Sequence, residues 1–288
     1  MKPVAFDYCR PDTVEETTAL LHEYGHDASV LAGGMSLGPM LNMRLVRPSV
    51  IVDINRITEL EQVGLTNGLV QTGSTVRQAD VMDDSELLNQ VPLLKLALPF
   101  VGHFQTRNRG TLGGSVGHAD PSAEIPLCLA TLGGEVELAS RRGKRLVRAS
   151  EFFLGVLTTT RRAGELITSL YWPQHTDSTY YAFDEVAQRH GDFAIAAAAC
   201  AVTLDEQKRI NKISLGFGGV EDKPVLASLT AFVGAEPTCS LASEIAFTAT
   251  KDLNPMEDAT AGAAYRTSLA TTLGRRVLQK AITEAGGR

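Results

Sequence analysis

The sequence predicts an α+β protein built from two domains. The chain has 288 residues, which is more than one compact domain usually contains. Patterns typical of helices and of strands alternate through the first part, whereas three strand-like runs precede a mainly helical stretch in the second. A polar segment at 173–179 separates the two parts. We therefore expect an N-terminal domain at 1–176, with subdomains at about 1–56 and 57–176, and a C-terminal domain at 177–288.

The first subdomain is predicted to alternate helices and strands around a glycine turn. Asp12 can cap a helix that Gly25 ends, because short polar side chains favour helix starts and glycine favours helix ends. Apolar strands are predicted at 29–32 and 49–54, with a helix at 39–45 between them. The turn after the first strand offers backbone N–H groups to an anion.

The second subdomain has regular elements on both sides of an irregular segment. Strands are predicted at 68–76, around Val136 and at 165–172, and helices at 86–101 and 123–131. The segment 103–121 holds four glycines and has neither helical nor alternating periodicity. It is therefore predicted to be a functional loop.

The C-terminal domain is predicted to contain an antiparallel sheet followed by helices. Its strands are expected at 180–186, 193–204 and 213–220, and the remainder to residue 285 is mainly helical. The alanine-rich run 193–202 also suits a helix by intrinsic propensity, so a helix is the alternative there.

Composition excludes several classes of function. The net charge of −6 is spread along the chain, so neither nucleic acid nor anionic lipid is an expected partner. No apolar run approaches the roughly 20 residues of a membrane span, and no secretory signal is visible, which predicts a cytoplasmic protein. The cysteines lack the short spacing of zinc or iron–sulfur ligands, so we assign no metal and expect buried free thiols. They are Cys9, Cys128, Cys200 and Cys239.

Two glycine clusters are the candidate binding elements. They comprise Ala32, Gly33, Gly34, Met35 and Ser36, and then Thr111, Leu112, Gly113, Gly114 and Ser115. Glycine lets a ligand approach the main chain, and the hydroxyl groups can donate hydrogen bonds, so the pair suits a diphosphate held between two lobes. Tight turns are the structural alternative for each cluster. The chain has neither the Rossmann glycine pattern nor a P-loop.

A serine hydrolase is a competing interpretation. Residues 34–38 match G-x-S-x-G, and Asp120 and His190 follow Ser36 in the order of one known triad. The predicted elbow ends the first recognisable strand, however, so no preceding sheet would present it. Asp120 can alternatively accept hydrogen bonds from ribityl or ribose hydroxyls, or complete a turn before Pro121.

Four stretches carry a resemblance to a known family: AGGMS, NMRLVRPSVIVDI, TRNRGTLGGSVGHADPSAEIP and RHGDFAIA. In order and spacing they resemble the FAD-binding medium subunits of the molybdenum hydroxylases, a group that includes carbon monoxide dehydrogenase and xanthine dehydrogenase. The resemblance implies a FAD domain of two α/β subdomains similar to vanillyl-alcohol oxidase. It also implies a C-terminal domain with a three-stranded antiparallel sheet and a helical bundle.

The resemblance also implies roles for individual residues toward a non-covalently bound FAD. Both glycine clusters would hold the diphosphate, Asp120 a FAD hydroxyl, and Leu166 would lie near the adenine. Phe193 takes a position where some relatives place a tyrosine against the isoalloxazine ring. Met35 replaces the glutamine or histidine of many relatives, and Asp184 replaces a lysine implicated in FAD contact, so neither side-chain role is carried over.

The function implied by the resemblance is electron transfer without a catalytic acid or base. A large molybdopterin-binding subunit would oxidise the substrate, and two-iron two-sulfur clusters on a small subunit would pass electrons to this FAD and then to an external acceptor. The expected assembly is a dimer of heterotrimers. The alternatives are a free-standing FAD-dependent oxidoreductase acting on a small organic substrate, and a non-catalytic nucleotide-binding assembly protein.

Overall fold

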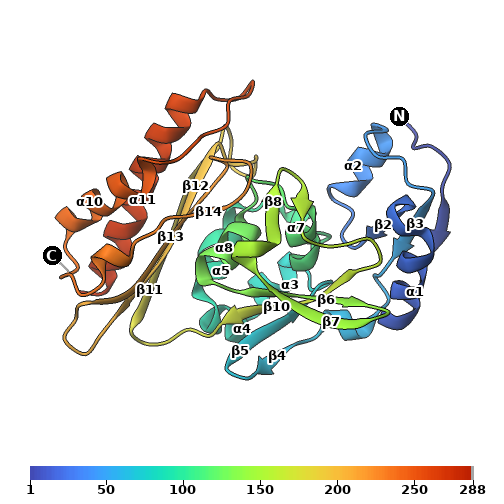
Figure 1. Ribbon diagram of the computed structural model, residues 1–288, viewed down its shortest axis with the longest axis horizontal. Coiled ribbons are helices and arrows are strands. Elements are labelled where there is room, and N and C mark those ends of the chain that lie inside the picture. The colour runs from blue at the N-terminus through green and yellow to red at the C-terminus, as the bar shows by residue number, and fades with distance from the viewer. Residues whose placement is uncertain (287–288) are drawn as a thin grey trace.

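The computed structural model describes residues 1–286. The chain runs from a small α/β unit through a central unit with a five-stranded sheet to a C-terminal sheet covered by helices (Figure 1). None of the helices in the described residues is long and apolar enough to cross a membrane. Of the four cysteines, Cys128 and Cys200 are buried, whereas Cys9 and Cys239 are half-buried, which corrects the expectation that all four are buried.

The N-terminal unit has a three-stranded parallel sheet in the order β1-β3-β2. Its elements are β1 (Asp7–Cys9), α1 (Val14–Tyr24), η1 (Gly25–Asp27), β2 (Ala28–Leu31), α2 (Leu37–Asn42) and β3 (Val50–Asp53). The predicted strands and helices are confirmed to within a few residues. The predicted cap Asp12 is wrong, because Thr13 caps α1 by accepting a hydrogen bond from the Glu16 N–H at 3.1 Å.

The central unit is built on an antiparallel sheet in the order β4-β5-β10-β6-β7. Its strands are β4 (Val63–Thr66), β5 (Leu69–Gly73), β6 (Glu135–Ser140), β7 (Gly143–Arg148) and β10 (Leu166–Pro173), preceded by η2 (Thr58–Glu61). The buried indole of Trp172 donates to the Thr72 hydroxyl at 3.0 Å and so joins β10 to β5. Sequence patterns did not predict the exposed strand β4 or the hairpin strand β7.

Short helices pack against this sheet, and a two-stranded hairpin follows them. The helices are α3 (Gln78–Asp83), α4 (Ser85–Gln90), α5 (Pro92–Ala97), η3 (Leu98–Phe100), α6 (Phe104–Arg107), α7 (Leu112–His118), α8 (Glu124–Leu132) and α9 (Ala149–Phe152). The hairpin strands are β8 (Phe153–Gly155) and β9 (Thr158–Thr159). The predicted helix at 86–101 is broken at Val91, because Pro92 starts a new helix instead of continuing the old one.

The predicted loop at 103–121 is largely helical, which corrects the sequence interpretation. Thr111 caps α7 by accepting a hydrogen bond from the Gly114 N–H at 2.9 Å. Leu112 and Val116, four positions apart, are both fully buried. The cap and these two anchors stabilise a helix whose glycines have low intrinsic propensity.

The C-terminal unit has a four-stranded antiparallel sheet, not the three strands that the resemblance implied. Its elements are β11 (Thr179–Val186), β12 (Ala196–Leu204), β13 (Ile210–Gly218), β14 (Val225–Leu226), η4 (Thr230–Phe232), α10 (Cys239–Thr250) and α11 (Ala263–Glu284). The extra strand β14 has two residues and pairs with the edge of β13. Two helices, α10 and α11, cover the outer face of this sheet (Figure 1).

Alternating burial explains why the alanine-rich run forms a strand. Ala197 and Ala199 belong to the core shared with the central unit, whereas Ala196, Ala198 and Cys200 pack into the core beneath α10 and α11. A period of two places small side chains on both faces, so layers can approach β12 from either side. Tertiary packing therefore decides against the helix that propensity alone allows.

Candidate cofactor cleft

A single cleft brings together the residues predicted to bind the cofactor, except Leu112, which is fully buried and does not line it. It has a volume of about 660 Å³, within the range usual for small-molecule and cofactor sites. Its lining includes Ala32, Gly33, Gly34, Met35, Ser36, Thr111, Gly113, Gly114, Ser115, Asp120, Leu166 and Phe193. These residues come from the N-terminal unit, the central unit and the turn before β12. The fold therefore assembles a shared cavity from segments that are far apart in sequence.

The turn between β2 and α2 has the properties of an anion site. In residues 1–286, no protein group accepts a hydrogen bond from the backbone N–H groups of Gly33, Gly34, Met35 or Ser36. Gly34 has φ = 74°, a left-handed conformation that glycine adopts without steric cost. Successive N–H groups around such a residue form a concave site for negative charge. A diphosphate fits this turn because the donors are present and lack protein acceptors.

The second glycine cluster differs from the expectation that its backbone would hold phosphate. The N–H groups of Leu112, Gly113 and Gly114 donate to Val76 O, Ser74 O and Thr111 Oγ1 at 3.0, 3.1 and 2.9 Å. These bonds occupy the N–H groups that begin α7, so they are not free for an anion. The hydroxyl of Ser115 remains a possible donor from this side of the cleft.

Close packing explains the glycines that face the cleft. A Cβ on Gly33 would lie 2.4 Å from the Arg109 carbonyl oxygen, and one on Gly113 would lie 2.4 Å from the Ser74 Cβ. Neither glycine has a positive φ, so the requirement is space and not a left-handed backbone. Gly33 is thus the point at which the 33–36 turn contacts the segment preceding α7.

A side-chain network that sequence patterns did not predict ties the two sides of the cleft together. The Asn55 amide donates to Ala32 O at 2.8 Å, and the Arg77 guanidinium donates both to Asn55 Oδ1 and to Arg109 O. The Asp53 carboxylate accepts hydrogen bonds from Asn55 and from the Tyr8 hydroxyl. The only signal in the sequence was the position of Asn55, directly after a buried strand.

The serine hydrolase interpretation fails on geometry. No hydrogen bond between described residues joins Ser36, Asp120 and His190. Asp120 Oδ1 accepts from the Ser122 N–H at 2.9 Å, in a turn. The His190 ring packs near Phe100, with the ring centroids 6.2 Å apart, and does not line the cleft that holds Ser36. A nucleophile cannot be activated without an adjacent base.

Two groups of lining residues differ in character. A Cβ on Gly191 would lie 2.9 Å from the Gly102 carbonyl oxygen, so the turn that holds Phe193 contacts the segment at Gly102. Phe193 is 65% exposed and is therefore not a core residue. Ala28 and Val30 of β2 pack in the same hydrophobic cluster as the buried Leu166. The first group offers an aromatic face to a ring, and the second offers apolar surface.

Two carboxyl groups near the cleft have strongly raised pKa values. Burial, with a smaller contribution from Asp120, raises the pKa of Glu124 to about 7. Burial and the neighbouring Glu124 raise the pKa of Glu185 to about 8, and its buried Oε2 has no hydrogen-bond partner in the described chain. Burial also lowers the pKa of His118, although Asp120 opposes this shift. The shifts of Glu124 and Glu185 reduce the negative charge beside a site suited to an anion, whereas the shift of His118 favours the neutral imidazole.

Comparison with known proteins covers nearly the whole chain. Residues 4–175 match the family model "FAD binding domain in molybdopterin dehydrogenase", and residues 181–281 match "CO dehydrogenase flavoprotein C-terminal domain". The chain is 35% identical to the 6-hydroxypseudooxynicotine dehydrogenase complex subunit alpha of Paenarthrobacter nicotinovorans, over 99% of this chain and 97% of that protein. It is also 35% identical to the caffeine dehydrogenase subunit beta of Pseudomonas sp. strain CBB1, over 98% and 96%.

Solved structures agree with these relatives. A chain of quinoline 2-oxidoreductase from Pseudomonas putida 86 superposes with a TM-score of 0.93 at 36% identity, over 99% of each chain. A chain of carbon monoxide dehydrogenase from Hydrogenophaga pseudoflava gives a TM-score of 0.94 at 30% identity, over 98% of this chain and 99% of that one. The chain therefore belongs to the FAD-binding medium subunits of the molybdenum hydroxylases, the family of oxidoreductases that includes carbon monoxide dehydrogenase and xanthine dehydrogenase.

Proposed function

We propose that this chain is the electron-transferring subunit of a heterotrimeric molybdenum hydroxylase. Electrons would pass from two-iron two-sulfur clusters of a small subunit through FAD to an external acceptor, while a large molybdopterin-binding subunit oxidises the organic substrate. The observation that carries this proposal is the full-length match to medium subunits of such complexes. A dimer of heterotrimers is the corresponding assembly.

The cleft supports the proposal because its lining is suited to binding a cofactor more than to catalysis on a substrate. No three His, Cys, Asp or Glu side chains among the described residues are grouped to hold a metal ion. The cofactor supplies the redox chemistry, whereas the protein supplies binding, orientation and electrostatics. The side chain of Phe193, which lines the cleft and is 65% exposed, offers a surface against which an isoalloxazine ring can pack.

The cleft geometry and the family resemblance support individual roles in FAD binding. The free N–H groups of Gly33, Gly34, Met35 and Ser36 would hold the diphosphate, assisted by the Ser115 hydroxyl. Asp120 would accept from a FAD hydroxyl, and Leu166 would pack near the adenine. Thr111, Gly113 and Gly114 would contribute mainly by positioning α7, whereas Ala32 would be positioned by Asn55. No covalent attachment of the flavin is expected.

The domain division is part of the same proposal. We assign 1–176 to the FAD-binding domain, with two subdomains similar to those of vanillyl-alcohol oxidase, and 177–288 to the C-terminal domain. The separate sheets of the three units and the ends of the two matched family regions support these bounds.

Affinity purification of the tagged chain from cells that express it naturally tests the proposal. The expected result is a complex with one molybdopterin protein and one iron–sulfur protein, and one FAD per tagged chain. A flavin-bearing chain that purifies alone and oxidises small organic substrates would overturn the proposal in favour of a free-standing oxidoreductase. A chain without flavin would overturn both interpretations.

A further inference from the structure

A buried arginine at the start of α11 contacts two segments that lead to the cofactor cleft. Arg266 lies in the first turn of that helix, and its side chain is 3% exposed. Its Nη1 donates hydrogen bonds to Ile195 O and to Gly219 O, each at 2.6 Å. A cation in the first turn of a helix faces the positive end of the helix dipole, which is unfavourable. The hydrogen bonds to the two carbonyl groups therefore account for an arginine where helix electrostatics disfavour one.

Both carbonyl groups belong to segments that lead directly to cleft residues. Ile195 lies two residues after Phe193, which lines the cleft. The Gly219 N–H donates to Pro121 O at 2.7 Å, and Pro121 follows the cleft residue Asp120. A Cβ on Gly219 would lie 3.0 Å from Ile195 O, so the two segments also lie against each other. The guanidinium does not line the cleft, yet it joins the segments that carry an aromatic ring and a carboxylate of its wall.

One carboxylate holds the guanidinium in place. The Arg266 Nη2 donates to Asp258 Oδ2 at 2.7 Å, and Asp258 Oδ1 accepts from the Thr260 and Ala261 N–H groups at 2.8 and 3.0 Å. These backbone hydrogen bonds, with a smaller contribution from Arg266, hold the pKa of Asp258 below its usual range. The buried Nε of Arg266 has no hydrogen-bond partner in the described chain. The orientation of the guanidinium therefore depends on Asp258 and on the two carbonyl groups.

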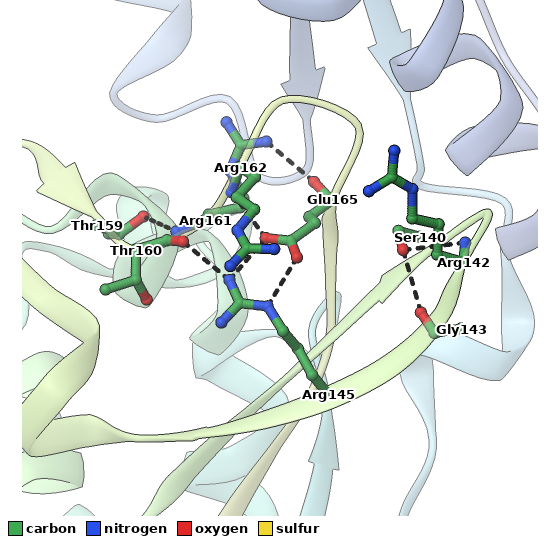
Figure 2. Close-up of polar contacts among 9 residues, drawn as sticks. All are labelled: Ser140, Arg142, Gly143, Arg145, Thr159, Thr160, Arg161, Arg162 and Glu165. Carbon is green, nitrogen blue, oxygen red and sulfur yellow. Dashed lines mark hydrogen bonds and ion pairs between the residues drawn. The ribbon is translucent and has the colours of Figure 1, made fainter.

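Another arginine–carboxylate pair in the fold holds a single turn of the cleft wall (Figure 2). Glu165 is 6% exposed and accepts hydrogen bonds from Arg145 at 2.7 and 2.8 Å. Arg145 also donates to Thr160 O at 2.9 Å, so the pair joins β7 to the turn at 160–165 within the central unit. A charged, bidentate pair of this kind fixes geometry as well as charge. Arg266 differs because its hydrogen bonds reach two segments that carry different cleft residues.

We propose that Arg266 is a positioning residue of the cofactor cleft, which holds the Phe193 and Asp120 segments in a fixed relation to each other. This inference rests on the proposed function, because these two residues act on a cofactor only if the cleft binds FAD. Segments that are held in place before binding lose less conformational freedom when the ligand binds, which strengthens affinity. A planar guanidinium can hold two carbonyl groups and a carboxylate at once, whereas a lysine ammonium is a compact point charge on a flexible stem.

A double-mutant cycle on FAD affinity tests this role. The full-length, flavin-freed chain is titrated with FAD. Arg266→Lys should weaken FAD binding about tenfold in the otherwise wild-type chain. The same substitution should weaken binding only about threefold when Phe193→Ala or Asp120→Ala is also present, because about half of the effect passes through each segment. A merely structural role would give the same loss in all three backgrounds.

Two further variants make the cycle decisive. Asp258→Asn removes the charged partner of the guanidinium at a side chain that is 50% exposed, so the protein should fold and bind FAD about threefold more weakly. This loss should disappear in the Arg266→Lys background and shrink in the Phe193→Ala background, so the test stands even if Arg266→Lys does not fold. Arg275→Lys is the matched control, because Arg275 is an exposed arginine of α11 whose side chain donates to Gln279 on the same helix. It should keep full FAD affinity.

The results separate the positioning role from its alternatives. Equal losses in all three backgrounds would refute it, as would full FAD affinity in both Arg266→Lys and Asp258→Asn. A loss in Arg275→Lys as large as that in Arg266→Lys would assign the effect to the charge of α11 and overturn the inference. A wild-type chain that binds no FAD would overturn the proposed function and this inference with it, and that result is distinct because it needs no substitution.

Discussion

Removal of the Phe193 ring should affect the flavin far more than the fold. The side chain is 65% exposed, so only about a third of it is buried. Full burial of a phenylalanine contributes roughly 1.5–3 kcal/mol, and a third of that is about 0.5–1 kcal/mol. Phe193→Ala should therefore reduce the free energy of unfolding of the apoprotein by about 1 kcal/mol or less. A core phenylalanine would cost about 3–5 kcal/mol.

The assay compares denaturant unfolding of the apoprotein with the absorbance spectrum and reoxidation rate of the flavin-bound protein. Phe104→Ala is the matched control, because Phe104 is 63% exposed and does not line the cleft. We expect both variants to unfold like the wild type and only Phe193→Ala to alter the flavin spectrum and its reoxidation. The reasoning is refuted if Phe193→Ala costs several kcal/mol in the apoprotein and leaves the flavin spectrum and reoxidation unchanged.

Four other perturbations have defined outcomes. Gly33→Val should abolish FAD retention, because its added Cβ would meet backbone atoms at 2.4 Å, whereas Gly38→Ala, in open space, should keep full flavin content; a flavin-replete valine variant would disprove this packing role. Ser36→Ala removes one hydroxyl donor and should weaken FAD binding by about 0.5–1.5 kcal/mol in a titration; complete loss of binding would point to a larger role. Acid precipitation should release all the flavin as FAD, and flavin in the pellet would mean covalent attachment. The raised pKa values of Glu124 and Glu185, about 7 and about 8, mean that their contribution to apoprotein stability is complete below about pH 4.5 and is lost as pH rises to about 8. Glu124→Gln should reduce the loss of unfolding free energy with rising pH by up to about 3 kcal/mol, since one pKa unit is about 1.4 kcal/mol. The melting temperature of the variant should therefore fall less with pH than that of the wild type; equal declines in the variant and the wild type would contradict this.

Local patterns in the sequence predict much of the N-terminal unit and of the C-terminal sheet. Buried strands such as β3 are short apolar runs, and the glycine turn at Gly33 and Gly34 marks the end of β2. The helix at 112–118 was missed because glycines lower helix propensity, and its stability depends on the Thr111 cap and on the burial of Leu112 and Val116. The strand β12 was ambiguous for the opposite reason, since alanine favours helices until two packed layers decide the matter.

The candidate site was predicted as a set of residues but not as a set of contacts. All twelve residues line the cleft. Glycines and small hydroxyl residues indicated the two clusters, whereas Leu166 and Phe193 were implied by the family resemblance. The sequence could not distinguish Gly34, in a turn with free N–H groups, from Gly113, which packs against Ser74. Arg77 and Asn55 were missed because their roles depend on pairings between distant segments.

The contact of Gly33 with Arg109 also joins segments that are synthesised at different times. Protein synthesis proceeds at roughly 5–20 residues per second, so Arg109 is added about 4–15 s after Gly33. Throughout that interval the 33–36 turn lacks the segment against which it packs. The cleft is therefore incomplete on the nascent chain until the segment preceding α7 has been synthesised.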